Sequence, residues 1–204
     1  MKVRLCVAAI FAVSALSATT ITGLFNTGAS TTGSADNVWT IVSPPGAGQV
    51  VGPVFVPVLW LPNTAASSWE WRTNTGQPVG TPTTPLVYTF RHLFILDPSY
   101  DASTVQITGR WSTDNFGTDI LVNGQSTAQT SPNFLAWSSF TLSSGFVSGL
   151  NVVDFVVSDV GFEGGFRVEW LTADAASSIP EPSSWTMLVA GVAAIGFARI
   201  RRSR

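Results

Sequence analysis

Residues 104–111 read TVQITGRW, and this stretch decides the fold class. Val105, Ile107 and Trp111 occupy alternate positions, and polar residues stand between them. Successive side chains of a β-strand point to opposite faces of its sheet, so this alternation is typical of a strand with one buried face. Residues 165–170, GFRVEW, repeat the same alternation. Both stretches are therefore predicted to be half-buried strands.

Other segments are strand candidates because they alternate or form short apolar runs. They are VWTIV (38–42), VFVPVLW (54–60), LVYTFRHLFIL (86–96), DILVNG (119–124), WSSFTL (137–142) and NVVDFVV (151–157). Turn signals rich in Pro, Gly, Asn and Asp separate them, and no amphipathic helix interrupts them. About nine short strands of this kind predict an all-β domain over residues 38–174. The expected architecture is an antiparallel β-sandwich of jelly-roll type.

The first 18 residues, MKVRLCVAAIFAVSALSA, combine two basic residues, an apolar run and small residues. This order predicts a secretory signal peptide over residues 1–18, cleaved after Ser17 or Ala18. The alternative is an N-terminal anchor that is retained, but the apolar run is short for crossing a bilayer. Residues 19–37 are small and polar, and are predicted to be a flexible lead-in.

The charge of residues 19–179, which we call the body, excludes some classes of partner. Residues 19–179 contain four arginines, no lysine and eleven acidic residues, a formal charge of about −7. A chain of this charge is poorly suited to binding nucleic acid or anionic lipid. The only cysteine, Cys6, lies in the predicted signal peptide, so the exported body has no internal disulfide. Its stability must come from core burial, to which seven tryptophans contribute.

The chain ends with IPEPSSWTMLVAGVAAIGFARIRRSR, which follows a short predicted linker over residues 175–179. Each proline fixes its own backbone angle and favours an extended conformation in the preceding residue, so Pro-Glu-Pro is stiff and non-helical. A helix over residues 183–200 would be about 27 Å long, marginal for a hydrocarbon core of about 30 Å. Basic residues then predict a cytoplasmic end: Arg199, Arg201, Arg202 and Arg204.

The order of Pro180, Glu181 and Pro182, an apolar helix and terminal arginines resembles the PEP-CTERM sorting domain. This resemblance covers residues 180–204 and implies processing by an exosortase, a membrane-embedded cysteine enzyme thought to act as a transpeptidase. It also implies export machinery as a partner and final delivery to the outer surface or extracellular matrix of a Gram-negative bacterium. The alternative is an ordinary C-terminal anchor in which Pro-Glu-Pro is incidental.

Residues 109–124, GRWSTDNFGTDILVNG, and the strands after them resemble galactose-binding-like jelly rolls, and this resemblance covers about residues 86–172. In those domains a similar run lies near the sugar-binding or calcium-binding loops. The resemblance implies that oxygen atoms of Asp114, Asn115, Asp119 and Asn123 contact a sugar or Ca²⁺. The alternative is structural, because Asp and Asn favour turns and the Asn-Gly pair favours a hairpin. No other cofactor is expected.

Aromatic residues leave a similar choice open. Trp69 and Trp71 alternate with a glutamate in SSWEWR and share one face, so they form either a sugar platform or part of the core. Trp111 follows the inward face of its strand and is expected in the core. His92, the only histidine, is expected to be a packed residue within a strand.

The sequence predicts a protein that is not an enzyme. No Ser or Cys nucleophile can be matched to the single histidine with an orienting acid. Two acidic pairs, Asp97 with Asp101 and Asp159 with Glu163, would serve a glycosidase only if they faced each other across one cleft. The body is expected to be a module that contacts exopolysaccharide, and the alternative is a structural matrix or adhesion protein without a small-molecule or glycan site.

Overall fold

The computed structural model describes residues 18–28, 34–44, 51–52, 56–72, 86–161, 163–178 and 191–192. The predicted all-β class is confirmed. The strands are β1 (Ala18–Thr20), β2 (Ser34–Ala35), β3 (Trp39–Ser43), β4 (Val51–Gly52), β5 (Leu86–Leu96), β6 (Gln106–Asp114), β7 (Phe116–Val122), β8 (Gln125–Ser126), β9 (Ser138–Leu142), β10 (Gly149–Asp159) and β11 (Gly165–Ala176). A 3-10 helix, η1 (Ala102–Thr104), precedes β6.

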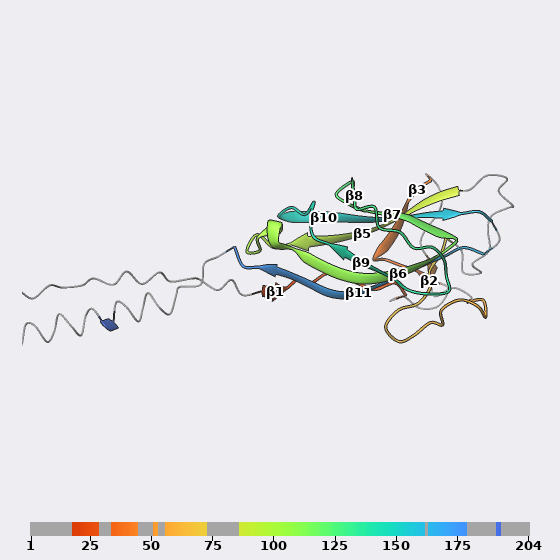
Figure 1. Cartoon of the computed structure of the whole chain (residues 1–204), viewed down its shortest axis with the longest axis horizontal. Helices are drawn as coiled ribbons and strands as arrows, with labels where there is room; N and C mark the ends of the chain where they lie inside the picture. The colour runs from red at the N-terminus through yellow and green to blue at the C-terminus, as the bar shows by residue number, and fades with distance from the viewer. Residues whose placement is uncertain are drawn as a thin grey trace, which may run out of the picture.

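Most of the strands pair into two antiparallel sheets that lie one above the other (Figure 1). The four-stranded sheet has the order β1-β11-β6-β9, and the five-stranded sheet has the order β3-β5-β10-β7-β8. Strands β2 and β4 form a separate ribbon. From β5 onwards the longer strands distribute between the sheets, with β5, β7 and β10 in one and β6, β9 and β11 in the other. This arrangement is consistent with a β-sandwich, and the jelly-roll topology stays a prediction.

Aromatic side chains from both sheets fill the space between them. The ring centroid of Phe90 on β5 lies 4.3 Å from that of Phe166 on β11. Trp111 on β6 meets Phe155 on β10 at 5.3 Å. All four side chains are fully buried, and so is Ile107, as the alternation in residues 104–111 predicted. Each large apolar side chain removed from water stabilises the fold by about 2 kcal/mol.

The strand predicted over residues 54–60 is wrong for its described part. Residues 56–60 form a turn in which Trp60 N donates to Pro57 O at 3.0 Å. Proline has no N–H to donate to a ladder, so Pro57 opposes a strand that its apolar neighbours favour. By contrast, the prediction over residues 86–96 matches β5 at both ends.

The flexible lead-in predicted for residues 19–37 is wrong for its described N-terminal part. Strand β1 pairs with β11 along its whole length, and Ile21, the residue that follows β1, is buried. Farther along, Thr27 N donates to Val168 O at 3.2 Å, and the Thr27 hydroxyl accepts from Val168 N at 3.1 Å. Small polar residues do not prevent a segment from pairing with a sheet edge, and here their backbone groups are satisfied by β11.

The linker predicted for residues 175–179 also differs from the structure. Strand β11 continues to Ala176, and Ser178 N donates to Ser99 O at 2.6 Å. The chain is therefore hydrogen-bonded to the body as far as Ser178, and Ile179 lies outside the described residues.

One side chain covers part of the outer edge of β9. Gln129 Nε2 donates to Thr141 O, and Gln129 Oε1 accepts from Thr141 N, both at 2.8 Å. The side-chain amide thus takes the hydrogen bonds that another strand would make, which protects an edge of the four-stranded sheet.

Candidate functional site

Three acidic residues gather at one end of the sandwich. Asp114 ends β6, Asp159 ends β10 and Glu163 precedes β11. Asp114 is 5% exposed, and its Oδ1 atom is buried without a hydrogen-bond partner. Burial raises the pKa of Asp114 to about 7, the charges of Asp159 and Glu163 add to the rise, and a hydrogen bond with Trp60 opposes it. Asp114 therefore exchanges its proton near neutral pH.

The oxygen atoms predicted to bind calcium or sugar are directed to different partners. Asn115 Oδ1 accepts from Val160 N at 2.7 Å, and Asp119 Oδ1 accepts from Ala128 N at 2.9 Å. Both oxygen atoms thus accept hydrogen bonds within the protein, and a role of these side chains in binding a ligand stays a prediction. Within the part of the chain that the structure describes, no cluster of three or more His, Cys, Asp or Glu is arranged to hold a metal ion.

Asn123 forms the hairpin between β7 and β8 together with Gly124. Both residues have positive φ, 49° and 81°. Asn123 Nδ2 donates to Gly145 O at 2.8 Å and to Asn151 Oδ1 at 2.9 Å, and its Oδ1 accepts from Val152 N at 2.9 Å. The hairpin predicted from the Asn-Gly pair is present, and the Asn123 amide is fully used in fixing it to the strands beside it.

The rings of Trp69 and Trp71 are both fully buried. Trp69 Nε1 donates to Leu61 O at 2.6 Å, and the Trp71 ring lies 4.8 Å from that of Tyr88. A Cβ atom at Gly164 would lie only 2.1 Å from the Trp71 ring, so a glycine is needed for this contact. Neither ring presents a face to solvent in this structure, and both contribute to the core.

The two acidic pairs considered for a glycosidase lie at opposite ends of the five-stranded sheet. Asp97 follows the last residue of β5, whereas Asp159 pairs with the first residue of β5. The strand has 11 residues and at about 3.3 Å per residue spans more than 30 Å. Glycosidase carboxylates lie about 5–10 Å apart, so these pairs do not share a cleft.

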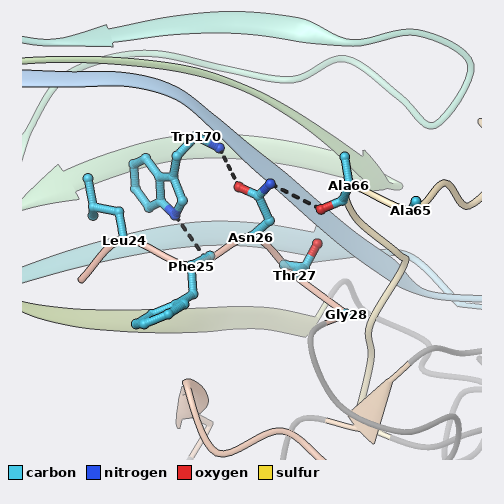
Figure 2. Close-up of a pocket in the computed structure, with 8 residues that line it drawn as sticks. All are labelled: Leu24, Phe25, Asn26, Thr27, Gly28, Ala65, Ala66 and Trp170. Carbon is cyan, nitrogen blue, oxygen red and sulfur yellow. Dashed lines mark hydrogen bonds between the residues drawn. The ribbon is translucent and has the colours of Figure 1, made fainter. Parts of the chain in front are cut away.

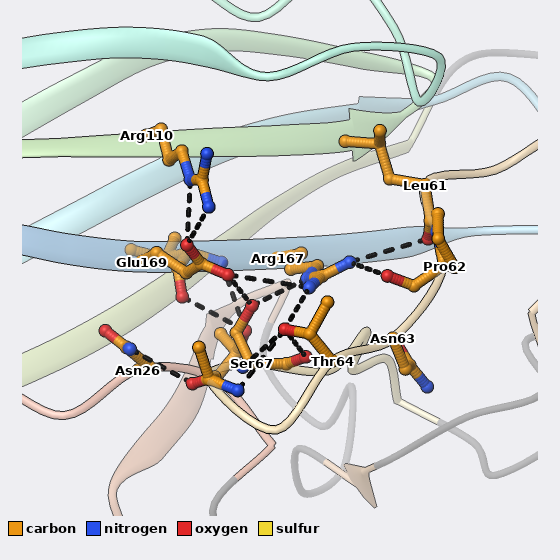
Figure 3. A network of polar contacts seen from close by, with 12 residues as sticks. Asn26, Leu61, Pro62, Asn63, Thr64, Ser67, Arg110, Arg167 and Glu169 are labelled. Atoms are coloured by element: carbon orange, nitrogen blue, oxygen red, sulfur yellow. Dashed lines mark hydrogen bonds and ion pairs between the residues drawn. The ribbon is translucent and has the colours of Figure 1, made fainter.

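A buried ionic network lies on the outer face of the four-stranded sheet, under the loop of residues 61–69 (Figure 3). Arg110 Nε donates to Glu169 Oε2 at 2.8 Å, and Ser67 Oγ donates to Glu169 Oε1 at 2.6 Å. Arg167 Nε donates to Ser67 Oγ at 2.7 Å, and its Nη2 lies 3.5 Å from Glu169 Oε1. The Arg167 side chain is only 1% exposed.

The remaining donors of the network hold the loop in place. Arg167 Nη1 donates to Pro62 O at 2.6 Å, and Nη2 donates to Thr64 Oγ1 at 3.1 Å. The guanidinium carbons of Arg110 and Arg167 lie 4.6 and 4.7 Å from the centroid of the Trp137 ring. Alternation in the sequence places Arg167 on an outward face, but no local signal indicated that a distant loop would cover it.

A second buried polar pair was also missed by sequence reasoning. Glu70 Oε1 accepts from Gly28 N at 2.6 Å, and Asp36 Oδ1 accepts from Trp39 N at 3.0 Å. Burial raises the pKa of Glu70 to about 10, and the hydrogen bond with Asp36 and its charge add to the rise. Glu70 is therefore protonated at neutral pH, which removes one of two negative charges that would otherwise lie close together in the interior. The pair ties the segment that follows β1 to the start of β3.

His92 is a packed residue within β5, as expected. It is fully buried, its ring lies 4.8 Å from that of Trp39, and its Nε2 is 3.0 Å from Gly23 O. Burial lowers the pKa of His92, so the ring is neutral at neutral pH.

An open pocket of about 390 Å³ lies beside Trp170 on the four-stranded sheet (Figure 2). Asn26 Oδ1 accepts from Trp170 N at 2.8 Å, and Asn26 Nδ2 donates to Ala66 O at 3.0 Å. Trp170 Nε1 donates to Phe25 O at 3.0 Å, and the Phe25 side chain is half-exposed. The pocket combines an accessible aromatic ring with polar groups that are already paired within the protein.

Both ends of the body lie at the same end of the sandwich, opposite the three acidic residues. Ala18 faces Ala176 in the ladder between β1 and β11 (Figure 1). Residues 178–202, which follow directly, match the PEP-CTERM protein-sorting motif. The chain carries a PEP-CTERM sorting motif. No curated protein and no solved structure matches the chain.

The PEP-CTERM motif implies export, membrane-associated sorting to the cell surface and processing by an exosortase-type membrane enzyme. The PEP-CTERM resemblance stated from the sequence is thereby confirmed, whereas no match supports a similarity to galactose-binding-like domains. The residues predicted to act in sorting lie outside the described residues: Pro180, Glu181, Pro182, Arg199, Arg201, Arg202 and Arg204. Nearly all of the predicted signal peptide also lies outside them. No helix in the described part of the chain is long and apolar enough to cross a membrane.

Proposed function

We propose that this PEP-CTERM protein is a structural matrix or adhesion protein on the outer surface of a Gram-negative cell, and that its body has no small-molecule site. One observation carries the proposal: the largest aromatic side chains turn inward. Trp39, Trp69, Trp71 and Trp111 are all fully buried. A glycan-binding module needs exposed aromatic faces for stacking on sugar rings, whereas a structural sandwich uses its aromatics to fill the core.

Contact with exopolysaccharide is the second candidate, and the pocket of Figure 2 favours it. Phe25 at this pocket is 52% exposed, and Trp170 beside it is partly exposed. The accessible ring can stack on the apolar face of a sugar, and the Asn26 amide, which makes one hydrogen bond through each polar atom, keeps one donor and one acceptor for sugar hydroxyls. No cofactor is proposed for either role.

We also propose that the body is not catalytic. Asp114 has a pKa of about 7, which suits proton transfer. However, Asp114 is only 5% exposed, and none of the residues that line the pocket of Figure 2 is acidic. A role in display and cohesion requires no accessible acid.

The sorting route is tested by replacing Pro180, Glu181 and Pro182 with alanine in the full chain. Intact-mass measurement and cell fractionation are expected to show a shortened wild-type protein outside and a full-length variant retained in the membrane. Ser183→Ala combined with Ser184→Ala is the matched control, because it changes the same segment and leaves Pro-Glu-Pro intact. If the alanine variant is still shortened and released, the motif does not direct sorting.

The role of the body is tested on the processed protein with exopolysaccharide isolated from the producing cells. Phe25→Ala and Phe116→Ala form a matched pair, since the two rings are 52% and 50% exposed at different places. The structural proposal expects co-sedimentation with the polysaccharide to be weak and unchanged by either substitution. Strong binding that only Phe25→Ala abolishes would establish the glycan-contacting role instead.

A further inference from the structure

The body holds the chain by hydrogen bonds as far as the first residue of the sorting motif. Asp101 N donates to Ala176 O at 2.8 Å, and Ala176 N donates to Thr104 Oγ1 at 2.8 Å. Ser178 N donates to Ser99 O at 2.6 Å, and Ser178 Oγ donates to Pro98 O at 2.9 Å. We call these contacts between residues 98–104 and residues 176–178 the clasp.

The loop that forms the clasp is itself well fixed. Tyr100 N donates to Asp97 O at 3.0 Å, and Asp97 Oδ1 accepts from Ser99 N at 2.8 Å, which closes a turn. Asp101 is the N-cap of η1 and accepts from Ser103 N at 3.0 Å. The Tyr100 hydroxyl donates to Thr20 O at 3.1 Å and so joins the loop to β1.

Three segments therefore form one surface where the chain leaves the body. They are residues 18–20, 97–104 and 174–178, and we call this surface the exit end. Each segment is hydrogen-bonded to another one, so the exit end has a defined shape up to Ser178.

The exit end is separated from Pro-Glu-Pro by a very short stretch of chain. Only Ile179 separates Ser178 from Pro180. Two consecutive residues span at most about 7 Å in a fully extended chain. An enzyme that binds Pro180 while the clasp is closed must therefore approach the exit end closely.

We propose that the exit end is a second recognition surface for the sorting enzyme, and that the clasp orients it. This inference rests on the sorting route described above. Because the clasp holds the chain up to Ser178, the motif begins close to the exit end, and little freedom of the described segments is lost when the enzyme contacts both. A flexible spacer would uncouple the two contacts and lower the effective concentration of the second one.

The charge of the exit end favours a protein partner over the lipid surface. Asp97, Asp101 and Asp174 lie on it, and no basic residue falls within its three segments. Carboxylates are repelled by the negative surface of a membrane rich in anionic lipids. The outward-facing surface of the enzyme itself is therefore the proposed partner.

A spacer insertion tests the proposal in the full chain. Gly-Ser-Gly-Ser is inserted between Ser178 and Ile179, and the rate of processing is followed by pulse labelling in the producing cell. The matched control carries the same insertion between Leu135 and Ala136, two exposed loop residues. The spacer at Ser178 is expected to slow processing about threefold or more, because it uncouples the two contacts, while the control insertion leaves the rate unchanged. An unchanged or faster rate with the spacer at Ser178 would overturn the proposal.

Two substitutions of opposite charge at one position distinguish contact with the enzyme from contact with the bilayer. Pro98 is exposed, and only its carbonyl contributes to the clasp, so Pro98→Lys and Pro98→Glu change the surface in opposite senses with the same backbone change. Contact with the enzyme predicts slower processing for both variants. Faster processing for Lys with slower processing for Glu would assign the surface to anionic lipid and overturn the proposal. Failure of the sorting route itself would be recognised separately, by continued processing of the Pro-Glu-Pro alanine variant.

Discussion

Glu169 lies opposite Arg110 in the ladder between β11 and β6, and its carboxylate forms ion pairs with both this partly exposed arginine and the buried Arg167. One carboxylate is therefore shared by two cations of very different exposure. The Arg110 side chain is 39% exposed, whereas that of Arg167 is 1% exposed. The loop of residues 61–69 depends on this network, because Arg167 holds the loop by its carbonyl and hydroxyl groups.

Substitutions in this network are expected to have unequal effects. Glu169→Ala leaves a buried guanidinium without its counter-charge and should lower the free energy of unfolding by about 3 kcal/mol. Arg110→Ala removes a partly exposed ion pair and should cost about 1 kcal/mol or less. Chemical denaturation of the processed protein measures both values. Equal losses would show that burial of Arg167 does not determine the energetics.

Trp69→Ala should destabilise the body by about 4 kcal/mol, because it removes a fully buried ring and leaves a cavity. Phe116→Ala, at a half-exposed ring, should change the free energy of unfolding by no more than about 0.5 kcal/mol. Denaturation curves of the two variants provide the comparison. A stable Trp69→Ala protein would contradict the assignment of this residue to the core.

Asn123 contributes both a backbone conformation and side-chain hydrogen bonds, and two substitutions separate them. Asn123→Ala loses the bonds and places alanine at positive φ, so it should cost about 2 kcal/mol. Asn123→Gly loses the same bonds but tolerates positive φ, so about 1 kcal/mol is expected. Thermal unfolding of both variants gives the difference. If alanine and glycine are equally destabilising, the left-handed conformation contributes nothing.

The stability of the body should fall as the pH rises above neutrality. Because the pKa of Glu70 is raised from 4.5 to about 10, the folded protein keeps a proton that the unfolded chain releases. The proton stabilises the fold fully below about pH 4.5, and its contribution is lost progressively up to about pH 10, by as much as about 1.4 kcal/mol per pH unit.

Two other groups limit the useful range of that experiment. Asp114, with a pKa raised to about 7, acts in the same direction at lower pH. His92, with a lowered pKa, acts in the opposite direction below its unfolded pKa of about 6.5. Denaturation between about pH 7.5 and 9.5 therefore reports mainly on Glu70. Glu70→Gln should flatten the dependence in this range, and a variant with the wild-type slope would disprove the assignment.

The strands were predictable because their signals are local. Residues 86–96 and 104–111 carry alternation or an apolar run within themselves, and the Asn123-Gly124 pair carries its own turn. The sorting motif was predictable for a similar reason, since its three parts follow one another within about 25 residues at the C-terminus.

Most of the body's polar chemistry depends on long-range contacts and was not predictable. Ser67 bonds Glu169 across 102 positions of the sequence, and the pairing of Glu70 with Asp36 depends on how β3 enters the sheet. The errors at both ends of the body have the same origin, because segments of small and polar residues resemble linkers until a partner strand is known. The alternatives for Trp69 and Trp71 could be separated only by knowing what covers them.

The hydrogen bonds of the Gln129 amide bear on how copies of the protein contact one another at high local concentration. A protein that accumulates on a surface meets many copies of itself, and exposed strand edges are the templates on which such copies merge into cross-β fibres. By occupying both backbone groups of Thr141, Gln129 removes one rung from such a template. A side chain that contributes little to the core thereby opposes strand pairing between neighbouring copies at this position of β9.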